Sequence, residues 1–231
     1  MKALILTSGG VDSTTCLAIA IDKYGKENVS SLSVYYGQKH EKELECARKV
    51  SEYYDVKHYE IDLSSIMQFS NCSLLKKSSE DIEYGSYADQ LNKSNNLPLD
   101  TYVPFRNGLF ISAVTSLALS IYPNEQVNIY CGIHSDDSGS AYPDCSTEFN
   151  EAMREAVYYG SGKLVDLVSP LVKLKKKDVV KWGLELKVPF ELTWSCYEGN
   201  DEACGKCATC IDRLKAFEAN GVKDPIKYKG E

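Results

Sequence analysis

The chain has 231 residues, of which 43% are hydrophobic and 26% charged, and its formal net charge is −7. This length suits one large domain, or one domain with a small appendage, and it is sufficient to bury a core without disulfide bonds. The acidic balance argues against a general nucleic-acid or anionic-membrane binder, and the apolar runs are too short for a secretory signal or a membrane span. We therefore expect a globular cytoplasmic protein.

Hydrophobic periodicity in the first third of the chain alternates between the strand and the helix repeat. Strands are expected at 2–6, 30–35 and 57–61, and helices at 12–24 and 41–54. This order predicts a parallel sheet flanked by helices, that is, a Rossmann-like α/β fold.

The remainder of the chain begins with an irregular stretch. Residues 64–105 are rich in Ser, Asn, Lys and Asp, so we expect an excursion that is partly mobile or folds over the site. The lysine run at 173–177 is typical of a solvated helix start, with a phosphate or dimer contact as the alternative. We expect an α/β domain at 1–191 and a C-terminal segment at 192–231. The further elements expected are helices near 107–122, 147–160, 175–186 and 208–220 and strands at 127–131 and 164–168.

A glycine turn lies directly between the first strand and the first helix. Two adjacent glycines let the backbone turn sharply and approach a ligand, and the amides at the helix start form a nest for an anion. An aspartate in the turn is suited to holding Mg²⁺ or to capping the helix. The turn lacks the P-loop and dinucleotide patterns and instead resembles the pyrophosphate loop of the N-type ATP pyrophosphatases. That resemblance implies ATP binding by Ser8, Gly9, Gly10, Val11, Asp12, Ser13 and Thr14.

Nine cysteines is a high count for a chain expected in a reducing compartment, where metal binding or catalysis is a commoner use than disulfides. Five are scattered and are expected to be buried apolar side chains. The other four are spaced so that their thiolates can converge on one tetrahedral metal, which predicts a closed, structural zinc site. An iron–sulfur cluster and a redox thiol are the alternatives. The four are Cys196, Cys204, Cys207 and Cys210.

Polar residues follow several of the predicted strands, where the ligand crevice of a parallel sheet lies. Arg106 suits an anionic group, and three carboxylates beyond the fourth strand suggest Mg²⁺ or recognition of a base edge, or else a polar surface turn. Trp194 and Tyr197 either stack on a flat heterocycle or pack around the metal. The candidate catalytic residues are His40, Arg106, Asp136, Asp137 and Asp144.

Taken in order, the strings SGGVDS, YYGQKH, VPFRN, YPDC and TWSC with CGKCxxC resemble the 7-cyano-7-deazaguanine synthase family across the whole chain. The resemblance implies an adenine nucleotide alpha hydrolase-like fold, one zinc ion on the four cysteines, and a homodimer. It also implies that 7-carboxy-7-deazaguanine and ammonia become the nitrile with ATP and Mg²⁺, in queuosine biosynthesis. Lys39 stands where many relatives have Arg. The loop before the YPDC string is longer than usual, and Ser146, directly after the string, replaces a base.

Two other functions remain open at the level of sequence. One is another adenylating enzyme on the same fold, such as a tRNA-thiolating enzyme, although no RNA-binding domain is evident. The other is a non-catalytic nucleotide-binding adaptor with a zinc module. No glutaminase domain is visible, so free ammonia is the expected nitrogen source.

Overall fold

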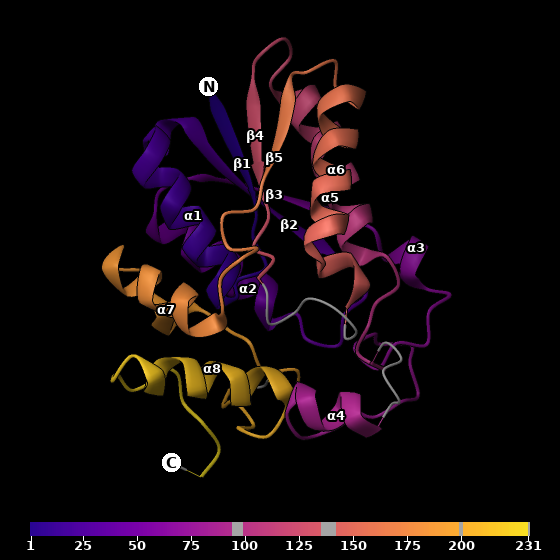
Figure 1. Cartoon of the computed structure of the whole chain (residues 1–231), viewed down its shortest axis with the longest axis vertical. Helices are drawn as coiled ribbons and strands as arrows, with labels where there is room; N and C mark the ends of the chain where they lie inside the picture. Colours follow the sequence, from indigo (N-terminus) through magenta and orange to yellow (C-terminus); the bar gives the residue numbers. More distant parts are fainter. Residues whose placement is uncertain (94–98, 135–141, 199–200, 231) are drawn as a thin grey trace.

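The computed structural model describes residues 1–93, 99–134, 142–198 and 201–230. Its centre is a five-stranded sheet in the order β3-β2-β1-β4-β5, in which every neighbouring pair is parallel (Figure 1). The strands are β1 (Lys2–Leu6), β2 (Val29–Tyr35), β3 (Lys57–Asp62), β4 (Val127–Tyr130) and β5 (Val165–Val168). The predicted α/β fold is confirmed, and all five expected strands are present.

The helices also lie where the periodicity places them, within one or two residues at most ends. Among the described residues, none is long and apolar enough to cross a membrane. The main helices are α1 (Val11–Tyr24), α2 (Lys42–Tyr53), α5 (Arg106–Ile121), α6 (Thr147–Gly160), α7 (Lys176–Glu185) and α8 (Ala208–Ala219). Short helices complete the set: η1 (Lys26–Asn28), α3 (Ser64–Met67), α4 (Tyr87–Lys93), η3 (Pro143–Cys145) and η4 (Phe190–Leu192).

Helices cover both faces of the sheet, and this explains why the central strands are apolar on both sides. On one face α1, α2, α7 and α8 enclose a core that includes Leu17 and Phe217. On the other face α5 and α6 enclose a second core that includes Ile111 and Val157. Along β1, Leu4 is fully buried in the second core and its neighbours Ala3 and Ile5 in the first. The scattered cysteines are all buried free thiols, as expected.

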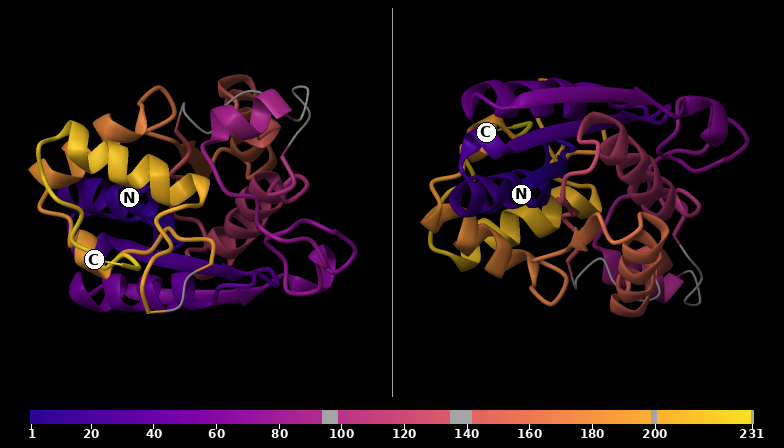
Figure 2. Two further views of the ribbon diagram at one scale, coloured as in Figure 1. Left: turned by 90° about the horizontal axis from the view of Figure 1, so that it is seen from below. Right: turned by 90° about the horizontal axis from the view of Figure 1, so that it is seen from above.

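The excursion folds back against the tail. Figures 1 and 2 show α4 near one end of α8, on the side of the sheet where the strands end. The backbone of Tyr84 pairs with that of Cys207, and the Gly85 N–H donates to the Lys206 carbonyl oxygen at 3.1 Å. These backbone contacts attach the excursion to the cysteine segment. The structure therefore agrees with the expectation that this stretch folds over the site.

Candidate active site

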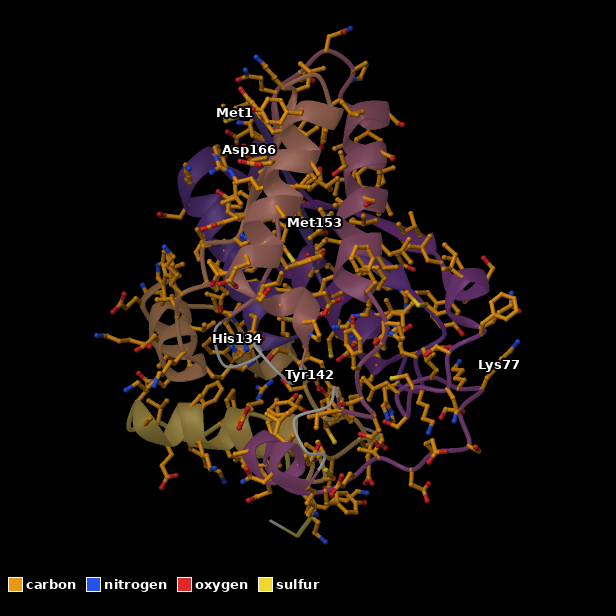
Figure 3. The ribbon with its side chains drawn as sticks, turned by 45° about the vertical axis from the view of Figure 1, so that its right-hand side comes forward. Met1, Lys77, His134, Tyr142, Met153 and Asp166 are labelled. Carbon is orange, nitrogen blue, oxygen red and sulfur yellow. The ribbon has the colours of Figure 1, made fainter. Side chains whose placement is uncertain are left out.

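A cavity of about 260 Å³ lies at the carboxyl ends of β1, β2 and β4, where the strand order reverses. His134 and Tyr142 lie at this end of the molecule, far from Met1 (Figure 3). The walls come from the glycine turn, the segment after β2, the excursion, the start of α5 and the tail. The predicted site residues that line the cavity are Ser8, Gly10, Val11, Asp12, Ser13, His40, Arg106, Asp144 and Cys196.

The glycine turn is held rigidly behind the cavity. Gly9 has φ of 77°, and a Cβ atom there would lie 2.7 Å from the backbone nitrogen of Ala47 on α2. A side chain at this position is therefore excluded by both conformation and space. The Gly9 carbonyl oxygen accepts a hydrogen bond from the Trp194 N–H at 2.8 Å. The turn is thus fixed between α2 and the tail, and Thr14 is fully buried behind it.

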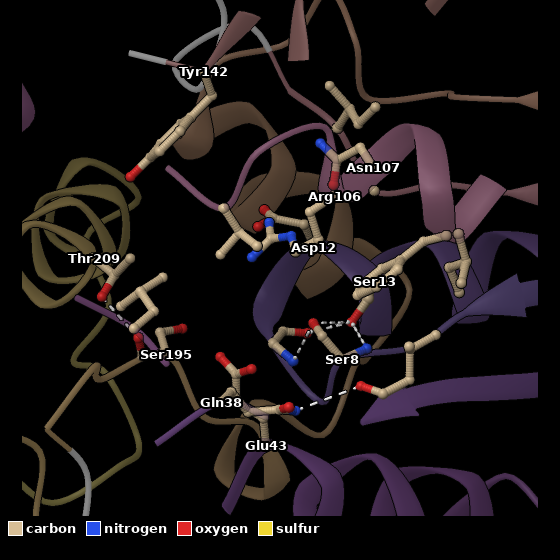
Figure 4. A pocket seen from close by; sticks show the side chains of 18 of the residues that line it. Ser8, Asp12, Ser13, Gln38, Glu43, Arg106, Asn107, Tyr142, Ser195 and Thr209 are labelled. Atoms are coloured by element: carbon tan, nitrogen blue, oxygen red, sulfur yellow. Dashed lines mark hydrogen bonds between the residues drawn. The ribbon is translucent and has the colours of Figure 1, made fainter. Parts of the chain in front are cut away.

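Within the turn, Ser8 and Ser13 brace each other. The Ser8 N–H donates to Ser13 Oγ at 3.1 Å, and the two hydroxyl oxygens are also 3.1 Å apart (Figure 4). The Gly10 N–H donates to Ser8 Oγ at 3.3 Å. Gly10 is the N-cap of α1, so the amides of the first helical turn face the cavity without a side-chain cap. This arrangement suits an anion.

Asp12, in the first turn of α1, has one oxygen that is paired and one that is not. Its Oδ2 accepts a hydrogen bond from Lys176 Nζ at 2.5 Å and lies 3.7 Å from His134 Nε2. Its Oδ1 is buried and has no hydrogen-bond partner in the described part of the chain. A buried carboxylate oxygen without a donor is suited to a divalent cation, so the donor set fits Mg²⁺ at this edge of the cavity.

One lysine of the run at 173–177 faces the cavity and not the solvent. Lys173, Lys175 and Lys177 are exposed, as expected for a solvated helix start. Lys176 instead lies at the first position of α7, with only 14% of its side chain exposed, and reaches the cavity beside Asp12. A run of identical residues gives no signal for which member turns inward. That choice depends on how α7 packs against α1.

The Arg106 guanidinium lies over two aromatic rings of the cavity wall. Its central carbon is 5.5 Å from the centre of the Tyr36 ring and 5.9 Å from that of Phe110. Burial disfavours its charge, but the neighbouring Tyr36, Cys145 and Asp144 raise its pKa, so it remains a cation. It is placed to meet an anionic group in the cavity.

Asp144 is 4% exposed, and its Oδ2 accepts the Asn107 N–H at 2.9 Å at the start of α5. Burial raises the pKa of this carboxyl. One oxygen of Asp144 therefore accepts a hydrogen bond from the N-terminus of α5, next to Arg106. Asp136 and Asp137 lie outside the described residues. Ser146, directly after η3, caps α6 by accepting the Phe149 N–H at 3.1 Å.

The segment after β2 contributes three side chains. Gln38 is buried, and its Oε1 accepts the Tyr36 N–H at 2.8 Å, so it shapes the end of β2. His40 is half-buried and lines the cavity. Glu43, which the sequence reasoning missed, lines it as well, and burial raises its pKa to about 7. The signal was available: Glu43 lies three residues after His40, in the first turn of α2, and so at the end of the same polar string.

The four tail cysteines form a compact buried cluster. Their sulfur atoms all lie within 4.8 Å of one another, and the Sγ atoms of Cys204 and Cys210 are 4.0 Å apart. Backbone N–H groups of Lys206 and Cys207 each donate to Cys204 Sγ at 3.3 Å, as in a turn built around a metal-bound thiolate. This cluster can hold a metal ion.

The two aromatics beside the cysteines have different surroundings. Trp194 is 4% exposed, packs in the cysteine cluster, and donates from Nε1 to the Cys196 carbonyl oxygen at 3.0 Å. Tyr197 is half-buried in the cavity wall, where its hydroxyl lies 2.8 Å from that of Tyr87 on α4. Trp194 therefore mainly packs around the cysteines, and Tyr197 forms part of the cavity wall.

Comparison with known proteins matches the chain to one family over nearly its whole length. The family model of the queuosine biosynthesis protein QueC matches residues 2–221. The 7-cyano-7-deazaguanine synthase of Caldicellulosiruptor saccharolyticus is 42% identical over all of this chain and 97% of its own length. That of Archaeoglobus fulgidus is 40% identical over 98% of this chain and 90% of its own. Among solved structures, an NMN synthetase from Francisella tularensis has a TM-score of 0.49 and 16% identity, over 96% of this chain and 78% of that one. The chain belongs to the QueC family of queuosine biosynthesis proteins.

Proposed function

We propose that this protein is a 7-cyano-7-deazaguanine synthase, an ATP-dependent ligase that converts 7-carboxy-7-deazaguanine and ammonia into the nitrile. One observation carries the proposal. The anion-binding turn, with Asp12 and Lys176 beside it, opens into the same cavity as the Arg106 cation and an aromatic wall. ATP and a flat anionic heterocycle therefore have complementary surfaces in a single site.

In the first step, an oxygen of the substrate carboxylate attacks the α-phosphorus of ATP, and the bond from that phosphorus to the bridging oxygen of the leaving diphosphate breaks. The amides at the start of α1 and the Lys176 ammonium stabilise the negative charge that develops on this diphosphate. Asp12 would hold Mg²⁺ through its unpaired Oδ1, and the bound ion would supply further positive charge. Because these groups are fixed in advance, little reorganisation is needed in the transition state.

The second stage repeats this activation on the amide. Ammonia displaces AMP from the acyl adenylate and gives the amide and one proton. The amide oxygen then attacks a second ATP and releases pyrophosphate, and loss of AMP with a proton leaves the nitrile. Arg106 is proposed to orient the anionic groups, and His40 and Asp144 to assist proton transfer. Asp136 and Asp137 remain predicted site residues on the basis of sequence.

We propose zinc as the metal of the cysteine cluster. Four thiolates at Zn–S distances of about 2.3 Å in a tetrahedron are about 3.8 Å apart, close to the Cys204–Cys210 spacing of 4.0 Å. A closed site of four sulfurs is structural, because it leaves no position for water. We therefore retain 192–231 as a zinc-dependent segment attached to the α/β domain at 1–191. A cytoplasmic homodimer that acts without nucleic acid or membrane remains our expectation.

The direct test is incubation with ATP, Mg²⁺, ammonium and 7-carboxy-7-deazaguanine, followed by mass spectrometry. We expect the amide and then the nitrile, with two AMP and two pyrophosphate formed per nitrile. A parallel reaction with tRNA in place of the deazapurine tests the thiolating alternative. Absence of both organic products, or turnover to ADP and phosphate alone, contradicts the proposal.

A further inference from the structure

Glu43 presents a carboxylate to the cavity, and no side chain among the described residues donates a hydrogen bond to it. It lies in the first turn of α2, and Figure 4 shows it on the opposite side of the cavity from Arg106. It makes no hydrogen bond within the described part of the chain. Arg106 is close enough for its charge to act on the Glu43 carboxylate, but the two form no ion pair. Two other cations of the site have their own partners: Lys42 lies 3.9 Å above the Trp194 ring, and Lys176 pairs with Asp12.

Such a half-buried group is suited to donors from a ligand. A carboxylate removed from water is costly unless it is hydrogen-bonded, and this one is aimed into the space where the substrate must bind. Its two oxygens can accept two parallel N–H groups, as they do from an arginine fork. In a deazaguanine the N1–H and the 2-amino group form a matching pair of donors on one edge of the ring.

The rest of the substrate fits the same orientation. The 7-carboxylate projects from the five-membered ring, away from the N1–H and 2-amino edge. Arg106 and Glu43 reach the cavity from opposite sides, one a cation and the other an acceptor. A ring bound with its carboxylate toward Arg106 therefore directs its donor edge toward Glu43. Close packing against the backbone of Gly9 fixes the turn that carries Glu43.

We propose that Glu43 is a specificity-determining residue that accepts hydrogen bonds from the N1–H and 2-amino edge of the deazaguanine ring. This inference rests on the proposed function. Glu43 would then make the enzyme select a substrate with a 2-amino group over a ring that lacks this group. The competing role for the same carboxylate is to take a proton from ammonium.

The test compares 7-carboxy-7-deazaguanine with its analogue lacking the 2-amino group, in the wild type and in Glu43→Gln. A hydrogen bond to a charged acceptor is stronger than one between neutral groups, so the loss of one of the two should give a wild-type preference of roughly 100-fold in kcat/KM. In Glu43→Gln the side-chain amide replaces one acceptor with a donor. We expect that preference to fall to within about threefold, mainly through a higher KM for the deazaguanine. The KM for ATP should stay unchanged.

Glu45→Gln is the matched control, because Glu45 is an exposed carboxylate two residues further along α2. It should retain the wild-type preference. Glu43→Asp, which keeps the charge but shortens the side chain, should retain part of it and so guards against a folding defect. An unchanged preference in Glu43→Gln overturns the inference. So does an equal loss of kcat for both substrates that added ammonia at high pH restores, which would assign the proton-accepting role. If the wild type converts neither substrate, the proposed function fails instead.

Discussion

Lys176→Met tests whether the inward-facing lysine stabilises the departing diphosphate. Methionine keeps most of the length and the apolar stem but removes the charge that lies 2.5 Å from Asp12 Oδ2. Removing one fixed electrostatic group at a site of developing charge typically lowers kcat about 100-fold, or about 2.7 kcal/mol in the barrier. We expect a loss of that size in the rate of AMP formation.

Lys177→Met provides the control, because Lys177 is the exposed neighbour in the same run. Its AMP formation should stay within twofold of the wild type. The Lys176–Asp12 pair is largely buried, with 14% and 20% of the side chains exposed, so we expect the free energy of unfolding to fall by about 1–2 kcal/mol in Lys176→Met. For a chain of this size that lowers Tm by only a few degrees. A Lys176→Met enzyme with AMP formation within threefold of the wild type would refute the reasoning.

Three further predictions concern the turn, the metal and the pH dependence. Gly9→Ala forces a Cβ into α2 at φ of 77°, so it should lower the free energy of unfolding by at least about 1–2 kcal/mol, measured by urea denaturation, and raise the KM for ATP. Cys207→Ser should abolish stoichiometric zinc binding, measured by mass spectrometry of the metal. It should also raise the KM for the deazapurine, because the backbone of Tyr84 pairs with that of Cys207. A variant with full zinc and a normal KM contradicts this prediction. Burial raises the pKa of Glu43 from 4.5 to about 7, so kcat/KM for the deazaguanine should rise as the pH passes through 7, a step that Glu43→Gln should lack. A carboxyl whose pKa is raised by folding destabilises the folded protein only at pH values above its pKa in the unfolded chain. Any gain in Tm from Glu43→Gln should therefore grow between about pH 4.5 and 7 and should be absent below about pH 4.5.

Much of the fold followed from local patterns. Strands β1 and β4 are short apolar runs ended by glycine turns or polar loops, and helices α1 and α5 repeat apolar residues at helical spacing. These patterns depend only on which side chains of an element face the core, so they can be recognised without knowing which other elements it packs against. Residues 64–105 show no hydrophobic periodicity. Their position over the cavity comes from backbone pairing with the tail, and such pairing cannot be recognised from the spacing of residues in the sequence.

The site divides in the same way. The glycine turn and the cysteine cluster could be predicted from local sequence, because each is a contiguous string whose chemistry depends on spacing along the chain. The contact of Lys176 with Asp12, across 164 positions, became visible only in the folded chain, as did the approach of Glu43 and Arg106 to one cavity from opposite sides. A helix directs successive side chains to different sides, and packing between helices distant in sequence sets which side faces the ligand and which faces the solvent.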